Sequence, residues 1–238
     1  MIFFEHSAQA QLKRSRPLTN PAYDLSKNRI HFGFSLGINI MDAEVANKGI
    51  VVTDDYGKDL VLWTDISQSI PGFNVNIISE LRISSNFSLR ILPGMAFGQR
   101  TFSFYKLQSS QTPRDTLYHK MKIESSMIEI PILFKYSANR HADYRPYLIA
   151  GVNPRIDLAS RKKFSEDVHM GLKQLNVYGE LGFGVDFYLP FFKFSTELKY
   201  SRGFMGNLSS RRSDGYEFYP TSIDGVISDI IVLTFNFE

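Results

Sequence analysis

The amino-acid sequence predicts an all-β fold, an eight-stranded antiparallel up-and-down transmembrane β-barrel with long outer loops and short periplasmic turns. Apolar and polar residues alternate with period two in a series of segments, and no segment competes as a helix. The connections between these segments are alternately long and short. Their polar face carries glycine and both signs of charge, which suits a narrow barrel interior better than a solvated surface.

Composition limits the class of protein. The chain has 238 residues, of which 14% are aromatic and 21% charged, and it has no cysteine. The aromatic content excludes a disordered chain, and the lack of cysteine excludes a disulfide-built module or a cysteine-ligated metal domain. The sequence contains no run of about 18 apolar residues, so it predicts no membrane-spanning helix. The net charge of +3, from 27 basic and 24 acidic residues, indicates no nucleic-acid partner.

The first 29 residues are expected to lie outside the barrel. Residues 1–10 are interpreted as a signal-peptide remnant, because Ala8-Gln9-Ala10 matches the small-x-small pattern of a cleavage site. A frayed terminus with a chance match remains the alternative. Residues 11–29 predict an extended periplasmic lead-in, and residues 30–238 an outer-membrane β-barrel domain.

Period two is clearest in the first predicted strand, Ile30–Ile40, where large apolar residues alternate with small or polar ones. The same alternation predicts strands within residues 73–83, 87–97, 128–136, 175–187, 194–200 and 231–237. The segment Arg145–Leu158 is also strand-like, but Gly151 and Pro154 indicate a bulge, so its register stays open. The even number of strands places both termini in the periplasm, with the barrel in the cell outer membrane.

The long connections are expected outside the cell, at residues 41–70, 106–122, 159–174 and 204–223. The first contains two apolar runs separated by Asp54-Asp55-Tyr56-Gly57, which predicts a hairpin. Its candidate partner-contact residues are Tyr56, Leu60, Leu62 and Trp63. The alternative is that this acidic loop packs on the basic second and third loops, or that the basic loops contact lipopolysaccharide.

Period two alone does not say which face points outward, and a soluble barrel would put its apolar face inside. Glycines and balanced charges on the polar face favour the inverted, membrane arrangement. The charged residues of that face predict a lumen charge network of Glu80, Arg82, Arg90, Glu129, Lys135, Glu180, Asp186, Glu197 and Lys199. Because an eight-stranded barrel is filled by its own side chains, this network predicts a plug rather than a channel.

We expect no catalytic residue, no cofactor and no metal site, because no motif or ligand spacing for them occurs. His31 is expected inside the barrel near its periplasmic end, and His141 in a short turn. His119 and His169 flank outer loops, and a lipid-modifying enzyme that uses them is the less favoured alternative.

Several segments resemble the PorT-type outer-membrane β-barrels of Bacteroidota: HFGFSLGIN, EIPILFKYS, YLIAGV, FKFSTELKYSRG and the terminal LTFNFE. The resemblance spans Ile30–Glu238, and the lead-in followed by HFGFSLGIN indicates the PorT family itself. It implies a non-catalytic component, or an accessory or assembly factor, of the type IX secretion system, with gliding motility in relatives. The partners expected are other secretion proteins, outer-membrane lipid and lipopolysaccharide. A stand-alone barrel for adhesion or envelope integrity remains the alternative.

Overall fold

The computed structural model describes residues 29–47, 51–53, 59–107, 116–159, 170–172, 174–204, 208–212 and 223–238. Its strands are β1 (Ile30–Asn47), β2 (Val51–Thr53), β3 (Asp59–Arg82), β4 (Phe87–Ile91), β5 (Gly94–Leu107), β6 (Thr116–Glu129), β7 (Ile132–Ser137), β8 (Tyr144–Asp157), β9 (Met170–Leu172), β10 (Leu175–Tyr188), β11 (Lys193–Gly203), β12 (Leu208–Arg212) and β13 (Ile223–Phe237). Among these residues, no helix has the length and apolar character needed to span a membrane. The predicted signal-peptide remnant, and the lead-in up to residue 28, lie outside them.

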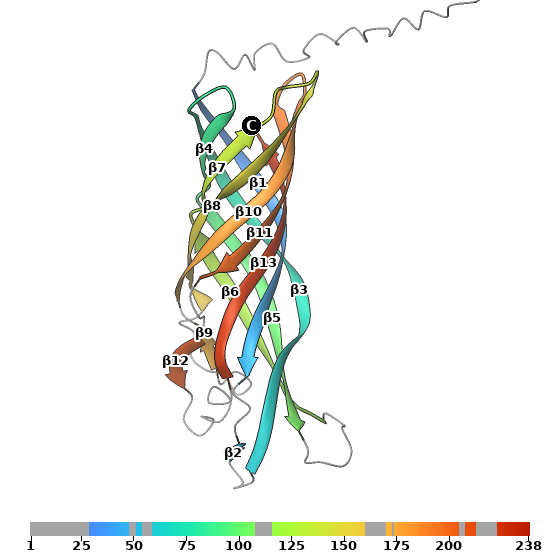
Figure 1. Cartoon of the computed structure of the whole chain (residues 1–238), viewed down its shortest axis with the longest axis vertical. Coiled ribbons are helices and arrows are strands. Elements are labelled where there is room, and N and C mark those ends of the chain that lie inside the picture. Colours follow the sequence, from blue (N-terminus) through green and yellow to red (C-terminus); the bar gives the residue numbers. More distant parts are fainter. Residues whose placement is uncertain are drawn as a thin grey trace, which may run out of the picture.

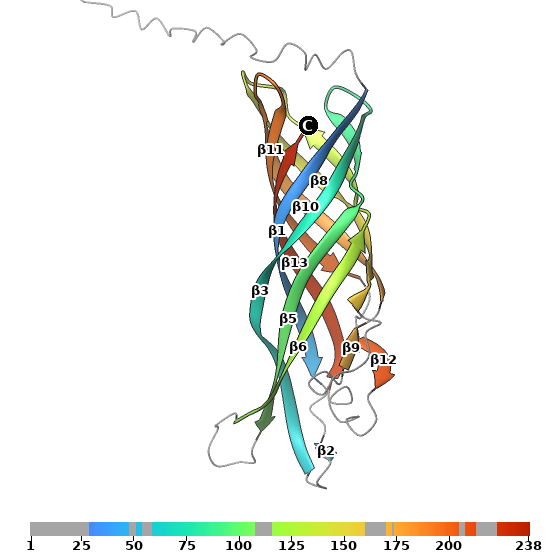
Figure 2. The same cartoon turned by 180° about the vertical axis from the view of Figure 1, so that it is seen from behind.

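All the described strands except β9 and β12 belong to one antiparallel sheet that closes into a barrel (Figures 1 and 2). The hydrogen-bonded path runs β1-β13-β11-β10-β8-β6-β5-β3-β4-β7, and β1 pairs with β3 to close it. Both β6 and β7 pair with β8, and both β4 and β5 pair with β3, so each couple occupies one position in the wall. The ten strands of the path therefore fill eight wall positions, which confirms the predicted fold class.

Prolines interrupt two wall positions without breaking the ladder between neighbours. Pro93 separates β4 from β5, and Pro131 separates β6 from β7. Proline carbonyls accept the neighbouring amides, in the bonds Ile77 N–H to Pro93 O (2.9 Å), Leu92 N–H to Pro131 O (3.0 Å) and Ile130 N–H to Pro154 O (3.2 Å). Buried backbone groups need such partners. The alternation of inward and outward side chains consequently continues across both interruptions.

The prediction of a bulge in β8 is wrong. β8 pairs with β10 in one unbroken register from Tyr144 to Ile156. Gly151 instead permits close approach of β7, because a Cβ there would collide with the carbonyl oxygen of Ile132. Pro154 lies opposite the interruption between β6 and β7, and its carbonyl accepts the Ile130 amide there (3.2 Å).

We call the end of the barrel that carries Ile30 and Phe237 the terminal end, and the opposite end the loop end (Figure 1). Strands extend further toward the loop end than predicted, because β1, β3, β5 and β6 continue into the connections expected at 41–70 and 106–122. β2 pairs with β3 through Val51↔Val61 and Val52↔Leu60, which confirms the predicted hairpin. A second small sheet joins β9 and β12.

The wall closes only over its terminal part. β1 pairs with β3 from Ile30↔Leu81 to Ile40↔Pro71, and beyond that pair β1 continues beside β13 while β3 continues beside β5. Figures 1 and 2 show β3 curving away from its neighbour there. Asn47 rejoins the two strands at one point: Thr64 N–H donates to its Oδ1 (2.8 Å), and its Nδ2 donates to Thr64 O (2.9 Å).

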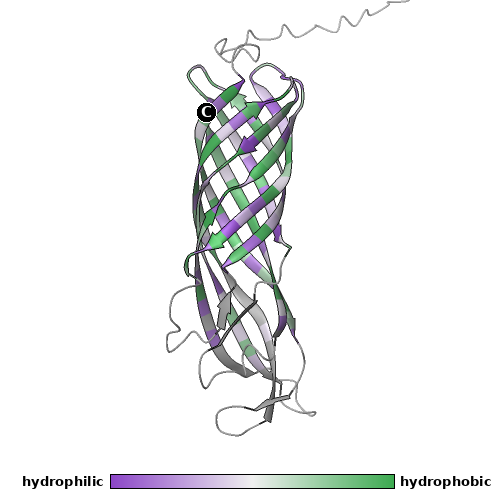
Figure 3. Ribbon diagram, turned by 90° about the vertical axis from the view of Figure 1, so that its left-hand side faces the viewer, coloured by the Kyte–Doolittle hydropathy of each residue, from purple (hydrophilic) through white to green (hydrophobic). Residues whose placement is uncertain are grey.

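The outer surface of the closed part is an apolar band, and Figure 3 shows hydrophobic and hydrophilic residues alternating along the strands that form it. Large apolar side chains point outward around the whole circuit, among them Phe34, Ile77, Ile91, Phe134, Leu148, Leu181, Leu198 and Leu233. Toward the loop end, outward charges replace them, and Arg202 there donates to Glu44 (2.7 Å). An apolar band with a charged border is typical of a barrel wall in contact with lipid.

Arginine in the middle of the apolar band should destabilise the barrel strongly. Leu148 is 60% exposed and lies between Tyr136 and Phe183 in register. We expect Leu148→Arg to lower the free energy of unfolding by about 2–4 kcal/mol, because a cation at this depth loses its hydration. Ala46→Arg, outward on β1 beyond the band, should cost about 0–1 kcal/mol. Urea unfolding in phospholipid vesicles measures both; equal costs would contradict the band.

Candidate functional site

Inward side chains of the closed wall form the candidate site. Eight residues of the predicted lumen charge network are at most 6% exposed: Glu80, Arg90, Glu129, Lys135, Glu180, Asp186, Glu197 and Lys199. The ninth, Arg82, is half-buried. All occupy inward positions because successive strand residues alternate between the two faces of the wall.

Arg90 on β4 is the centre of what we call the terminal cluster, formed by Glu80, Arg90, Lys135, Asp186, Lys193, Glu197 and Glu238. Its guanidinium, fully buried, donates from Nε and Nη2 to Glu80 Oε2 (3.0 and 2.6 Å). Nη1 donates to Glu197 Oε2 (3.2 Å) and Nη2 to Glu238 Oε1 (3.0 Å). Lys193 Nζ donates to the other oxygen of Glu238 (2.6 Å). One arginine thus joins three carboxylates from different parts of the wall.

Lys135 on β7 completes the terminal cluster. Its Nζ lies 2.8 and 3.0 Å from the two carboxylate oxygens of Asp186, and 3.7 Å from Glu80 Oε2. The same ammonium lies 4.0 Å from the ring centroid of Tyr147, a favourable cation–π distance. The Tyr147 hydroxyl donates to Glu197 Oε2 (2.8 Å). Each charge of the terminal cluster therefore lies beside an opposite charge.

A second group, the middle cluster, surrounds Arg155 on β8. Arg155 Nε lies 3.0 Å from Glu129 Oε2, and Nη2 donates to Glu180 Oε1 (3.0 Å). Asn153 Nδ2 donates to both carboxylates, at 3.1 and 2.7 Å. Lys199 Nζ lies 3.9 Å from Glu180 Oε2. These residues, Glu129, Asn153, Arg155, Glu180 and Lys199, define the middle cluster.

Lys199 connects the two clusters, since its Nζ also lies 3.6 Å from Glu197 Oε1 in the terminal cluster. Toward the loop end an apolar layer follows the middle cluster. It consists of Met41, Ala96, Met127, Tyr178, Ile230 and Val232. The Tyr178 ring lies 4.6 Å from the Arg155 guanidinium carbon, so the ionic and apolar layers are in direct contact. Buried side chains therefore stand between the two ends of the barrel, as in other narrow barrels.

Sequence reasoning missed Lys193 and Glu238 of the terminal cluster and Asn153 and Arg155 of the middle cluster. The signal that could have found them is the same alternation. Asn153 and Arg155 share the inward parity of Tyr147, but the expected bulge obscured it. Glu238 extends the inward series of β13 by one step beyond Asn236.

The predicted histidines do not converge on one site in the described part of the chain. His31 is half-buried at the terminal end, as expected, and His141 lies in the turn between β7 and β8. His119 belongs to β6, but its side chain lies outside the description, as does all of His169. Within the described ranges, no group of histidines and carboxylates has an arrangement that could hold a metal ion.

The candidate partner-contact residues lie at the loop end. Leu60, Leu62 and Trp63 belong to β3, opposite β2 and β5, and only their backbone is described. Tyr56 lies outside the described residues.

Comparison with known proteins identifies one family. A family described as outer membrane protein beta-barrel domain matches residues 9–209. No curated protein matches the chain. Similar solved structures include neisserial surface protein A, with 13% identity, 88% of this chain and 98% of that chain covered, and a TM-score of 0.40.

Two further solved structures are similar at the same level. The outer membrane protein OprG from Pseudomonas aeruginosa has 11% identity, covers 93% of this chain and 96% of its own, and has a TM-score of 0.44. The outer membrane protease OmpT from Escherichia coli has 11% identity, coverages of 89% and 96%, and a TM-score of 0.40.

Removing the cation at the centre of the terminal cluster should be costly. We expect Arg90→Met to lower the free energy of unfolding by about 3–5 kcal/mol, because it leaves buried carboxylates uncompensated. Arg100→Met is the matched control. Arg100 is just as buried, but it has no carboxylate at ion-pair distance among the described residues, and its Nε and Nη2 have no hydrogen-bond partner.

Arg100→Met should therefore be neutral or stabilising, because an incompletely satisfied buried charge is replaced by an apolar side chain of similar length. Urea unfolding in phospholipid vesicles compares the two variants. The role of Arg90 would be refuted if its replacement cost no more than that of Arg100.

Proposed function

The chain belongs to the outer membrane protein beta-barrel domain family and is an outer-membrane β-barrel protein, and from this we propose that it serves protein secretion as a non-catalytic accessory or assembly factor. The secretion system proposed is type IX, on the strength of the PorT-type segments in the sequence. In this proposal the barrel is not the conduit for exported proteins.

The observation that carries the accessory role is the filled lumen. The Arg90 guanidinium bonds carboxylates of Glu80, Glu197 and Glu238 across the interior, and none of these groups is left in a water-filled channel. A polypeptide could pass only if several buried ion pairs separated together. Each separated ion would then need a replacement for its lost partner, which is costly in a low-dielectric interior.

The loop end supports a role in contacting other proteins. β3, β5 and β6 continue past the last β1–β3 pair, and β2 adds a short edge strand to β3. Leu60, Leu62 and Trp63 lie on this extension, and Tyr56 lies in the connection between β2 and β3. Aromatic and large apolar residues are the common anchors of protein interfaces. We place the contact with secretion partners here.

Purified protein in planar lipid bilayers should show no large, stable conductance. The reason is that buried side chains of the two ionic clusters and the apolar layer block the lumen. A wide porin inserted under the same conditions is the positive control. A reproducible large pore from the intact chain would refute the accessory role, because the barrel could then serve as a conduit.

Deletion of the gene should abolish secretion of type IX cargo while the remaining outer membrane stays intact. A separate test addresses the contact residue: Trp63→Ala should weaken co-purification with secretion proteins. Trp63→Phe is the matched control, because it keeps an aromatic anchor at the same position. Normal cargo secretion by the deletion strain, with loss of adhesion or of envelope integrity, would favour the stand-alone alternative. Barrel folding of each variant is checked by its heat-modifiable mobility on a gel.

A further inference from the structure

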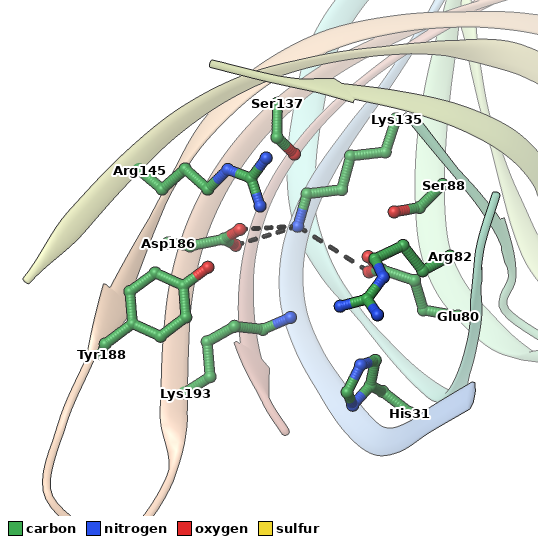
Figure 4. A pocket seen from close by; sticks show the side chains of 10 residues that line it. All are labelled: His31, Glu80, Arg82, Ser88, Lys135, Ser137, Arg145, Asp186, Tyr188 and Lys193. Atoms are coloured by element: carbon green, nitrogen blue, oxygen red, sulfur yellow. Dashed lines mark hydrogen bonds and ion pairs between the residues drawn. The ribbon is translucent and has the colours of Figure 1, made fainter. Parts of the chain in front are cut away.

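The terminal end of the lumen opens into a small vestibule of about 20 Å³ that is connected to solvent and has room for about one water-sized group. Its lining comes from strands all around the barrel, from β1 through β11 (Figure 4). The ion pairs of Lys135 with Asp186 and Glu80 form its floor. The vestibule is therefore part of the rigid closed wall, and no loop has to move to create it.

The carboxylates that face the vestibule are already engaged. Asp186 accepts hydrogen bonds from Lys135 (2.8 Å) and from the Ser195 hydroxyl (2.6 Å). Glu80 accepts two hydrogen bonds from Arg90. Both carboxylates are bound to partners below the opening, and neither forms an ion pair with an arginine at the rim.

Two arginines at the rim lack a carboxylate. Arg82 makes no ion pair with any described residue, and its Nη1 is buried without a hydrogen-bond partner. Arg145 donates from Nε to Ala138 O (2.6 Å) and from Nη2 to Ser85 O (2.5 Å). These neutral carbonyls hold the Arg145 guanidinium in place without cancelling its charge. Figure 4 shows Arg82 and Arg145 on opposite sides of the opening.

Cationic and acidic side chains lie close together at this end of the lumen. The terminal cluster and the rim contain the cations Arg82, Arg90, Lys135, Arg145 and Lys193 and the carboxylates Glu80, Asp186, Glu197 and Glu238. The middle cluster is balanced by itself, with Arg155 and Lys199 opposite Glu129 and Glu180. Among these residues, the two cations without a described carboxylate at ion-pair distance, Arg82 and Arg145, both line the vestibule.

We propose that the vestibule binds one oxyanion, a carboxylate or a phosphate group, between Arg82 and Arg145. Guanidinium groups match the geometry of both ligands and bind them through charge-assisted hydrogen bonds. The hydroxyls of Ser88, Ser137 and Tyr188 also line the space and can donate. This proposal does not rest on the role in secretion.

The size of the vestibule restricts the ligand. At about 20 Å³ it admits only the charged head of a flexible chain, such as the carboxylate of an acidic side chain or of a peptide end, or oxygens of a phosphate monoester, while the rest of the ligand stays outside. In the expected orientation this end faces the periplasm, so the occupant would be a group presented from that compartment. The bound group would hold that molecule against the periplasmic mouth of the barrel.

Titration of the full chain in lipid nanodiscs tests the site, with arginine side chains labelled by ¹⁵N and observed by NMR. Inorganic phosphate and N-acetylglycine, a minimal peptide carboxylate, are the probes, at constant chloride concentration. We expect saturable shifts of the Arg82 side-chain resonance. Arg82→Gln should weaken binding about tenfold or more, because one charge-assisted pair is lost.

Arg82→Gln should fold normally, since Arg82 has no ion pair to lose, and unchanged heat-modifiable mobility on a gel confirms it. Arg202→Gln, at the loop end, is the matched control and should leave binding unchanged, because Arg202 already pairs with Glu44 and Asp229. Tighter binding of N-acetylglycine would assign the site to a peptide carboxylate, and tighter binding of phosphate to a phosphate ester. Absence of saturable binding of both probes, or equal affinity in Arg82→Gln, would overturn the proposal.

Discussion

Mutual neutralisation of charge across a narrow lumen is the constraint on which this barrel depends. Its outward side chains form an apolar band, so the inward face must carry the polar residues that alternate with them. Eight wall positions leave room only for side chains, and an isolated ion among them would be very costly. The chain meets this constraint with connected clusters, in which Lys199 joins the Arg90 group to the Arg155 group.

The same clusters specify strand register. A one-residue slip of β10 against β8 would turn Glu180 and Asp186 toward the outer face and bring Leu181 and Phe183 into the lumen. It would also leave Lys135 and Arg155 without their carboxylates. The buried ion pairs in the lumen and the apolar side chains on the outer face therefore favour the same register. Solvent-exposed ion pairs would contribute little to this preference.

Alternation in the sequence predicted the strand faces and, together with the loop lengths, the fold class, while two apolar runs around turn residues predicted the β2–β3 hairpin. It failed at β8, because Gly151 and Pro154 were interpreted from their local preferences alone. Their roles depend on other strands: Gly151 accommodates β7, and Pro154 lies beside an interruption already present there. The contacts inside the site were equally non-local, since nothing in a single sequence places Glu238 beside Arg90. Sequence patterns show which face a residue occupies, but not which residue lies across the lumen.

The length over which β1 pairs with β3 to close the barrel depends on whether lipid or water surrounds the wall. Within lipid every backbone polar group needs a partner from the protein, whereas water can serve beyond the lipid. The pairing of β1 with β3 ends at Ile40, and the next outward residues of β1 are Asp42 and Glu44. Closure thus stops where the outer surface changes from apolar to charged. Strands beyond that level do not have to pair all around the wall, because water can hydrogen-bond their free backbone groups. They can therefore diverge and present backbone edges with which a partner protein could pair. The ion pairs in the lumen hold the closed part together.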